Sequence, residues 1–216
     1  MLPKVIIHNS VTLDGALTGF TPDMALHYKL AGQYQPEATL IGSNTARIGF
    51  EMFGMPSAET SADFSQPQRS SSLPYWVIPD TRGSLKGLLH GCRRFEYCRD
   101  VVVLVSESTP RDYLDYLTER HYDYHVVGQD RIDLKQALAL LAEQYKAKTV
   151  LADTGKILSN LLITQGLADE LSLLVHPQID GGKGLNIFTG LRLDKLTLLG
   201  CKKYKNGPVW LRYGLK

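Results

Sequence analysis

The chain alternates between short apolar runs and longer segments in which apolar residues recur at helical spacing. Two of the runs, Val101–Val105 and Thr149–Ala152, are rich in β-branched residues and are bounded by polar or charged positions. This pattern is typical of strands that are buried on both faces. Runs of similar character at Lys4–His8, Ala38–Ile41 and Tyr75–Ile78 predict three more strands.

Helical spacing of apolar residues predicts three helices between these runs. A proline suits the first turn of one helix, an aspartate can cap another, and a glycine is placed to end the third. The predicted helices cover Arg111–Arg120 after Pro110, Leu134–Tyr145 after Asp133, and Lys156–Gln165 before Gly166.

The C-terminal part of the pattern predicts strands at Glu170–Val175, Leu193–Leu199 and Pro208–Tyr213. The turn residues 205–207 (Lys-Asn-Gly) indicate that the last two form a hairpin. Alternation of strands and helices is typical of βαβ units. We therefore expect an α/β fold, with a mostly parallel sheet flanked by helices and a C-terminal antiparallel hairpin.

No internal repeat or linker interrupts the pattern, so we expect residues 1–216 to form a single domain. The segment Met55–Leu73 is rich in Ser, Pro and Gln and shows little periodicity. Long loops of this kind are often lids or binding loops, and an unstructured insertion without a role is the alternative.

The composition excludes several classes of protein. A formal net charge of +2 with scattered Lys and Arg gives no basic stripe, so we expect no nucleic-acid partner. No apolar run approaches the ~18 residues that span a bilayer, and Met1–Ile7 has no signal-peptide pattern. Three cysteines without CxxC spacing and six histidines without an HExxH motif argue against disulfides and metal sites. We expect a cytoplasmic protein with no bound metal.

Small polar residues follow the predicted strands at several points. Ligands of doubly wound sheets bind at the carboxyl ends of strands, so these positions are candidates for a nucleotide site. The turn Asp153–Lys156 also opens a predicted helix, where backbone N–H groups form an anion site. The stretches are His8–Gly15, Gly42–Thr45, Ser106, Asp153–Lys156 and the glycine-rich Asp180–Gly184. Each alone is also compatible with an ordinary turn.

The motif Asn9-Ser10-Val11-Thr12-Leu13-Asp14-Gly15 resembles the opening of the reductase domain of riboflavin biosynthesis. Ile41-Gly42-Ser43-Asn44-Thr45 is similar to the Gly-x-x-Thr helix start of that family. Gly166-Leu167-Ala168-Asp169-Glu170-Leu171, followed by Pro177 and Gly181-Gly182-Lys183-Gly184, resembles its C-terminal signature. The resemblance implies a dihydrofolate-reductase-like fold, usually dimeric. It also implies that NADPH reduces the ribosylamino group of a pyrimidine phosphate to a ribitylamino group.

The chain departs from the family pattern at two places. The family usually carries two glycines before the helix that contacts the cofactor phosphates, and here the pair is Thr154-Gly155. Its Asp-Pro-x-Leu-x-x-Arg substrate segment is absent, and Arg47-Ile48-Gly49-Phe50-Glu51 stands there instead. No cytidine-deaminase-type zinc motif is present, so we expect a stand-alone reductase.

The resemblance, together with positions directly after predicted strands, suggests roles for individual residues. Asp14 is the expected catalytic carboxylate near the nicotinamide, with a turn-forming role as the alternative. Asp80 and Arg82 are expected to face the substrate or cofactor, or to form an exposed ion pair. The expected cofactor contacts are Asn9, Thr12, Gly42, Ser43, Asn44, Thr45, Ser106, Asp153, Thr154, Gly155, Lys156, Gly181 and Gly182. Ser106 could hydrogen-bond the adenosine 2′-phosphate of NADPH, but the negative charge of the adjacent Glu107 is unfavourable for that anion. The preference for NADPH over NADH therefore stays open.

Two alternative functions remain. In the first, the chain is a related reductase that acts on another pterin- or pyrimidine-like molecule. In the second, it is a non-catalytic dinucleotide-binding protein. The missing substrate segment favours these alternatives, and the polar strand ends favour an enzyme.

Overall fold

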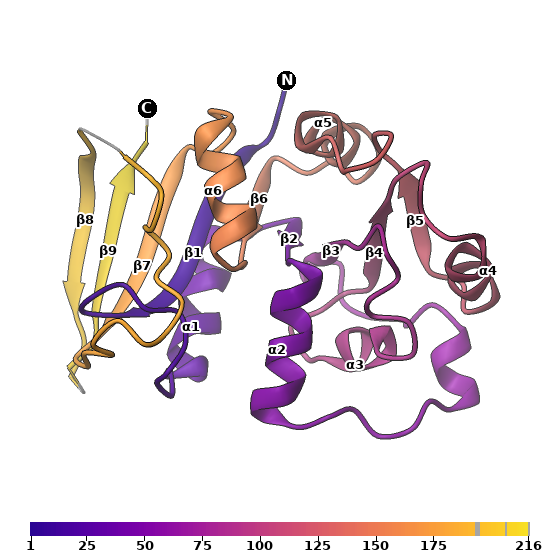
Figure 1. Cartoon of the computed structure of the whole chain (residues 1–216), viewed down its shortest axis with the longest axis horizontal. Coiled ribbons are helices and arrows are strands. Elements are labelled where there is room, and N and C mark those ends of the chain that lie inside the picture. Colours follow the sequence, from indigo (N-terminus) through magenta and orange to yellow (C-terminus); the bar gives the residue numbers. More distant parts are fainter. Residues whose placement is uncertain (193–194, 206, 216) are drawn as a thin grey trace. The chain divides into compact units, whose positions relative to one another are not determined.

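The computed structural model describes residues 1–192, 195–205 and 207–215 (Figure 1). Within it the chain divides into two compact units. Unit 1 comprises residues 1–3 and 35–148, and unit 2 comprises residues 4–34 and 149–216. Each unit is a layer of strands with helices packed on it, and we treat each in turn.

Unit 2 contains five strands in the order β6-β1-β7-β9-β8. The central strand β1 pairs in parallel with β6 and β7, whereas β9 runs antiparallel to β7 and β8. This confirms the expected parallel sheet with a C-terminal antiparallel hairpin. The elements are β1 (Lys4–Thr12), α1 (Met24–Ala31), η1 (Gly32–Tyr34), β6 (Thr149–Ala152), α6 (Lys156–Thr164), β7 (Glu170–His176), β8 (Thr197–Lys203) and β9 (Val209–Gly214).

The side-chain alternation of β1 places α1 and the start of α6 on opposite faces of this sheet. Ile6 clusters with Ala31 of α1 and Leu151 of β6. Asn9, an odd position on the same strand, instead contacts Thr154 before α6. The two faces therefore carry different polar groups at the carboxyl ends of the strands.

The prediction that β1 ends at His8 and is followed by a turn is wrong. Strand β1 continues to Thr12, because the ladder with β7 runs from Ile6↔Glu170 to Thr12↔His176. The polar residues His8 and Asn9 stay in the strand although both are buried, since each finds a hydrogen-bond partner there. Side-chain partners from other elements thus override the local polar pattern.

Unit 1 is an all-parallel sheet in the order β5-β4-β3-β2. Its core includes the β-branched face of β4, the aromatic residues of α4 and the buried side chains of α3. The elements are β2 (Ala38–Leu40), α2 (Ser43–Phe53), η2 (Ser61–Phe64), β3 (Tyr75–Pro79), α3 (Leu89–Arg94), β4 (Val101–Val105), α4 (Arg111–Glu119), β5 (Asp123–Val126) and α5 (Leu134–Gln144). Strand β5 was not predicted, because its four residues lack an apolar run.

The three predicted helices are confirmed as α4, α5 and α6. Asp133 caps α5 by accepting a hydrogen bond from Gln136 N at 2.9 Å, and Gly166 after α6 has a φ of +65°. None of the helices in the described part of the chain is long and apolar enough to cross a membrane.

The predicted strand Leu193–Leu199 begins later than expected, at Thr197. Leu193 and Asp194 lie outside the described residues, and so does Asn206 of the predicted turn. The hairpin itself is confirmed by the antiparallel pairing of β8 with β9 and by the hydrogen bond from Tyr204 N to Pro208 O.

The segment Met55–Leu73 is anchored to the rest of unit 1 by arginines. Arg94 binds the buried carboxylate of Asp63, and Arg120 binds Glu59 with three hydrogen bonds of 2.8–2.9 Å. Arg93 donates to the carbonyl of Asp63 at 2.8 Å. Arg69 in turn donates from the segment to carbonyl oxygens at the end of α3. The segment is thus an anchored strap rather than an insertion without contacts.

Candidate active site

Asn9 of the central strand β1 holds the turn between β6 and α6. Asn9 is 5% exposed, and its Nδ2 donates to Thr154 O at 2.9 Å. The hydroxyl of Ser159, one turn into α6, donates to the same carbonyl at 3.2 Å. The Oδ1 of Asn9 is buried and has no hydrogen-bond partner among the described residues. Asn9 therefore fixes the turn and also presents an acceptor that a ligand could use.

Helix α6 begins at a glycine, which has no side chain to cap the first turn. Gly155 is the N-cap, with φ −72° and ψ 179°, and in the described structure it provides no side-chain cap. In contrast, Asp23 and Asp133 cap α1 and α5 with their carboxylates. Because any residue can adopt this φ, the backbone conformation does not require glycine here. A glycine at this point permits close approach of an anion to the helix N-terminus.

Asp14 holds the loop that contains Gly181 and Gly182. Its carboxylate accepts from Thr12 Oγ1 at 2.6 Å, from Asp180 N at 3.1 Å and from Gly181 N at 2.9 Å. The Thr12 hydrogen bond and then the two backbone N–H groups lower the pKa of Asp14 to about 2. The carboxylate is consequently ionised at neutral pH, and its contacts support the turn-holding role that the sequence left open.

A cluster of histidines at the carboxyl ends of β1, β6 and β7 was missed by the sequence analysis. His27 of α1 is 2% exposed and lies between two polar groups. Its Nε2 is 3.2 Å from Asp153 Oδ2, and its Nδ1 is 3.0 Å from Ser10 Oγ. The ring centroids of His8 and His27 are 4.4 Å apart. The period-two spacing of His8, Ser10 and Thr12 on one strand face could have indicated this cluster.

The protonation of His8 follows from its partners. His8 Nε2 faces the carbonyl oxygen of His27 at 3.2 Å, and a carbonyl only accepts, so Nε2 carries the proton. Nδ1 then accepts from the hydroxyl of Ser172 at 2.8 Å, which itself accepts from Trp210 Nε1 at 2.8 Å. Burial, and then the neighbouring His27, lower the pKa of His8 to about 3. His8 is thus a neutral residue that fixes the backbone of α1 at His27.

The expected cofactor residues of unit 1 lie at the start of α2. Gly42 is the N-cap, again without a side-chain cap in the described structure, and Ser43, Asn44 and Thr45 form the first turn. Asn44 Oδ1 accepts from Arg47 at 2.8 Å. The glycine N-cap of α2 therefore repeats the arrangement found at Gly155 in unit 2.

Two further predicted residues are engaged in turns of unit 1. The buried hydroxyl of Ser106 lies 3.0 Å from Ser108 Oγ, within the turn after β4. Asp80 is 2% exposed and accepts from Ser84 N, from Ser84 Oγ and from Leu85 N at 2.8–2.9 Å. The contacts of Asp80 are those of a turn-holding carboxylate, whereas the side chain of Arg82 is exposed.

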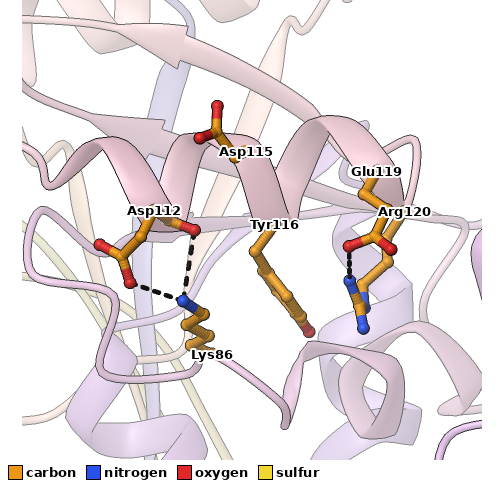
Figure 2. A pocket seen from close by; sticks show the side chains of 6 residues that line it. All are labelled: Lys86, Asp112, Asp115, Tyr116, Glu119 and Arg120. Atoms are coloured by element: carbon orange, nitrogen blue, oxygen red, sulfur yellow. Dashed lines mark hydrogen bonds and ion pairs between the residues drawn. The ribbon is translucent and has the colours of Figure 1, made fainter.

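A hollow on unit 1 lies along α4 (Figure 2). The side chains that line it are Lys86, Asp112, Asp115, Tyr116, Glu119 and Arg120. Its basic groups are paired, since Lys86 binds Asp112 at 2.6 Å and Arg120 binds Glu119 at 2.7 Å. None of the residues predicted for the site lines this hollow, and Asp115 is paired with Arg111 outside it.

These features place the chain in a class: it is an α/β protein with a dihydrofolate-reductase-like fold, and polar groups gather at the ends of its parallel strands. The chain belongs to the RibD C-terminal domain family, which matches residues 3–210. This is a family of oxidoreductases of riboflavin biosynthesis.

Solved structures show the same fold at low sequence identity. A pyrimidine reductase-like protein of Corynebacterium diphtheriae is 18% identical with a TM-score of 0.74, over 98% of this chain and 91% of that one. The riboflavin biosynthesis reductase Rib7 of Saccharomyces cerevisiae is 16% identical with a TM-score of 0.68, over 99% and 90%. RibD of Acinetobacter baumannii is 21% identical with a TM-score of 0.66, over 99% of this chain but only 58% of RibD. No curated protein matches the sequence.

Proposed function

We propose that the chain is an NADPH-dependent reductase of the riboflavin-biosynthesis type, which reduces the ribosylamino group of a pyrimidine 5′-phosphate. The observation that carries this proposal is the start of α6 at Gly155, directly after β6, in a member of the RibD C-terminal domain family. A helix N-terminus without a carboxylate cap suits the cofactor phosphates. The pyrimidine reductases among the similar structures support the substrate class.

The residues of unit 2 would hold one part of the cofactor. The backbone of Thr154 and Gly155 would bind phosphate oxygens, with Lys156 as a counter-charge, while Asn9 keeps the turn in place. Gly181 and Gly182 would contact the cofactor from the loop held by Asp14. The bound dinucleotide supplies a hydride. For unit 1, contacts of the α2 start and of Ser106, Asp80 and Arg82 with cofactor or substrate stay predictions.

Asp14 would orient the nicotinamide or the acceptor rather than supply a proton. Three hydrogen bonds hold its carboxylate in place, and its pKa of about 2 keeps it ionised at neutral pH. A fixed negative charge beside the reacting centre stabilises positive charge that develops there. The proton that completes the reduction must therefore come from another group.

A related reductase with another pyrimidine- or pterin-like substrate is the second candidate. It is favoured by Arg47–Glu51, which stands in place of the family's substrate segment. Arg47 there is bonded within α2 to Asn44 and to Glu51, rather than left for a ligand. The residues of this segment therefore distinguish the two candidate functions, which differ in their substrate.

The proposal is tested by adding reduced nicotinamide cofactor to the purified full chain and following its absorbance with candidate acceptors. We expect consumption with 5-amino-6-(5-phosphoribosylamino)uracil. Consumption only with another pyrimidine or pterin would favour the second candidate. Binding of cofactor without consumption by any acceptor would favour a non-catalytic binding protein.

We also propose that the chain forms a homodimer in the cytoplasm, as the family resemblance implies. The outer strand β8 supports this assembly, because Leu198 and Leu199 are 56% and 49% exposed on it. Exposed apolar side chains on an edge strand favour association. Sedimentation at micromolar concentration would decide, and a monomer of 24.1 kDa would contradict the dimer.

A further inference from the structure

The polar cluster on the α1 face of unit 2 has the form of a proton relay. Ser10, His27 and Asp153 come from β1, from α1 and from the turn after β6, and they meet in one line of hydrogen bonds. The outer members are accessible, since Ser10 is partly exposed and the side chain of Asp153 is 18% exposed. His27 between them is buried. A buried imidazole flanked by two accessible groups can pass a proton between them.

We propose that this line delivers the proton of the reduction, with Ser10 as the catalytic residue that contacts the substrate and with His27 and Asp153 as positioning residues. The inference rests on the proposed function. Asp153 accepts from His27 Nε2–H. Burial raises the pKa of the Asp153 carboxyl, but the neighbouring His27 lowers it more, so the pKa lies below its usual value and the carboxylate is ionised. The imidazolium then donates from Nδ1 to Ser10 Oγ.

The hydride of the reduced nicotinamide forms the new C–H bond at C1 of the ribosyl group, and the C–O bond of the sugar ring breaks. The electron pair of that bond stays on the ring oxygen, which takes the hydroxyl proton of Ser10. Ser10 takes the Nδ1 proton of His27, and after product release solvent returns one proton to Nδ1 through the partly exposed Ser10 hydroxyl.

The groups around His27 are arranged so that its proton can move. His8 faces it from β1 and is kept neutral by its burial, so it adds no competing positive charge. Asp153 faces it from the β6 end as the counter-charge. Asp23 at the N-cap of α1 and His176 at the end of β7 are the other ionisable groups that interact electrostatically within this cluster. Ser10 is the neighbour through which the proton would leave.

The test compares Ser10→Ala and Ser10→Thr in the full chain, with 5-amino-6-(5-phosphoribosylamino)uracil and reduced nicotinamide cofactor. Ser10→Ala should lower kcat at least about 100-fold, as expected for a lost proton transfer. KM and the affinity for the reduced cofactor, measured by nicotinamide fluorescence, should stay within about threefold, since the Ser10 hydroxyl acts in the transition state rather than in ground-state binding. Ser10→Thr keeps a hydroxyl and should recover most of the rate. Thr118→Ala, which removes an exposed hydroxyl on α4, is the matched control.

A pH profile separates the relay from a structural role. Asp153→Asn should move the alkaline limb of the kcat profile to lower pH, because the imidazolium loses its counter-charge. Wild-type kcat and an unchanged profile in Ser10→Ala would overturn the relay alone. Failure of the wild-type chain to oxidise the reduced cofactor would overturn the proposed function and the relay with it.

Discussion

At the scale of single residues, Asp14 holds the glycine-rich loop and is proposed to orient the reactants, and one substitution can separate these two roles. Asp14→Asn keeps the shape but replaces one acceptor oxygen by an amide that cannot accept from Asp180 N or Gly181 N. We expect the melting temperature to fall, and kcat per folded molecule to fall about 100-fold because a fixed charge beside the reacting centre is lost.

Thermal unfolding and steady-state rates on the same preparation measure both effects of Asp14→Asn. A lower melting temperature with wild-type kcat would leave Asp14 only as the residue that holds the glycine-rich loop. The proposed function would then rest on the cofactor-binding turns.

His8 makes stability depend on pH. Its pKa is about 3 in the folded chain against about 6.5 when unfolded, so between these values only the unfolded state takes up the proton. The free energy of unfolding should therefore fall as the pH drops below about 6.5, by up to about 1.4 kcal/mol per pH unit from this group. His125 and His176, whose pKa values burial also lowers, add to the slope.

Urea unfolding at several pH values between about 5.5 and 6.5 measures this slope above the range where most carboxylates titrate. His8→Asn should be less stable but should show a shallower slope, by about one proton. An equal slope in both proteins would show that His8 is not held neutral.

At the scale of elements, the start of α6 is the part of the chain most sensitive to added volume if it binds phosphate. Gly155→Val should weaken binding of the reduced cofactor at least about tenfold, or about 1.4 kcal/mol. Gly32→Val is the matched control, because a Cβ at that exposed glycine meets no atom within 4 Å. Nicotinamide fluorescence titration measures both variants. Equal affinity in a folded Gly155→Val protein would remove this turn from the site.

The anchoring of residues 55–73 to the rest of unit 1 should depend on the buried carboxylate of Asp63. Asp63 is 5% exposed, and the guanidinium of Arg94 holds its pKa well below the usual range. Asp63→Ala leaves that guanidinium without its partner and should lower the free energy of unfolding by about 1–3 kcal/mol. Asp112→Ala breaks an exposed pair with Lys86 and should cost less than about 1 kcal/mol.

Urea denaturation measures the change in stability, and limited proteolysis shows whether residues 55–73 become accessible to cleavage. If both variants behave alike, the strap is not held by Asp63.

The elements that the sequence predicted well are those whose own pattern determines them. Val101–Val105 and Thr149–Ala152 are strands with the predicted bounds, and Asp133 caps α5 as expected. Strand β1 was predicted too short because Ser172, His27 and Thr154 supply the hydrogen bonds of its polar half, and these residues are distant in sequence. The relay was missed for the same reason.

At the scale of the whole molecule, the predicted site residues fall in both units. Asp14 and the Asp153–Lys156 turn belong to unit 2, whereas Gly42–Thr45, Asp80 and Ser106 belong to unit 1. A residue pattern identifies strand ends one at a time, and it does not show which hydroxyls and carboxylates are already used within their own turns. Asp80 and Ser106 illustrate this limit, because their local partners are visible only in the fold.

The measurement that tests the central claim most directly is transfer of deuterium from cofactor to product. The full chain is incubated with NADPH deuterated at C4 of the nicotinamide and with 5-amino-6-(5-phosphoribosylamino)uracil, and the product is analysed by mass spectrometry and NMR. The account predicts a ribitylamino product that carries one deuterium at C1 of the former ribosyl group. Unchanged substrate and unoxidised cofactor after prolonged incubation would contradict it.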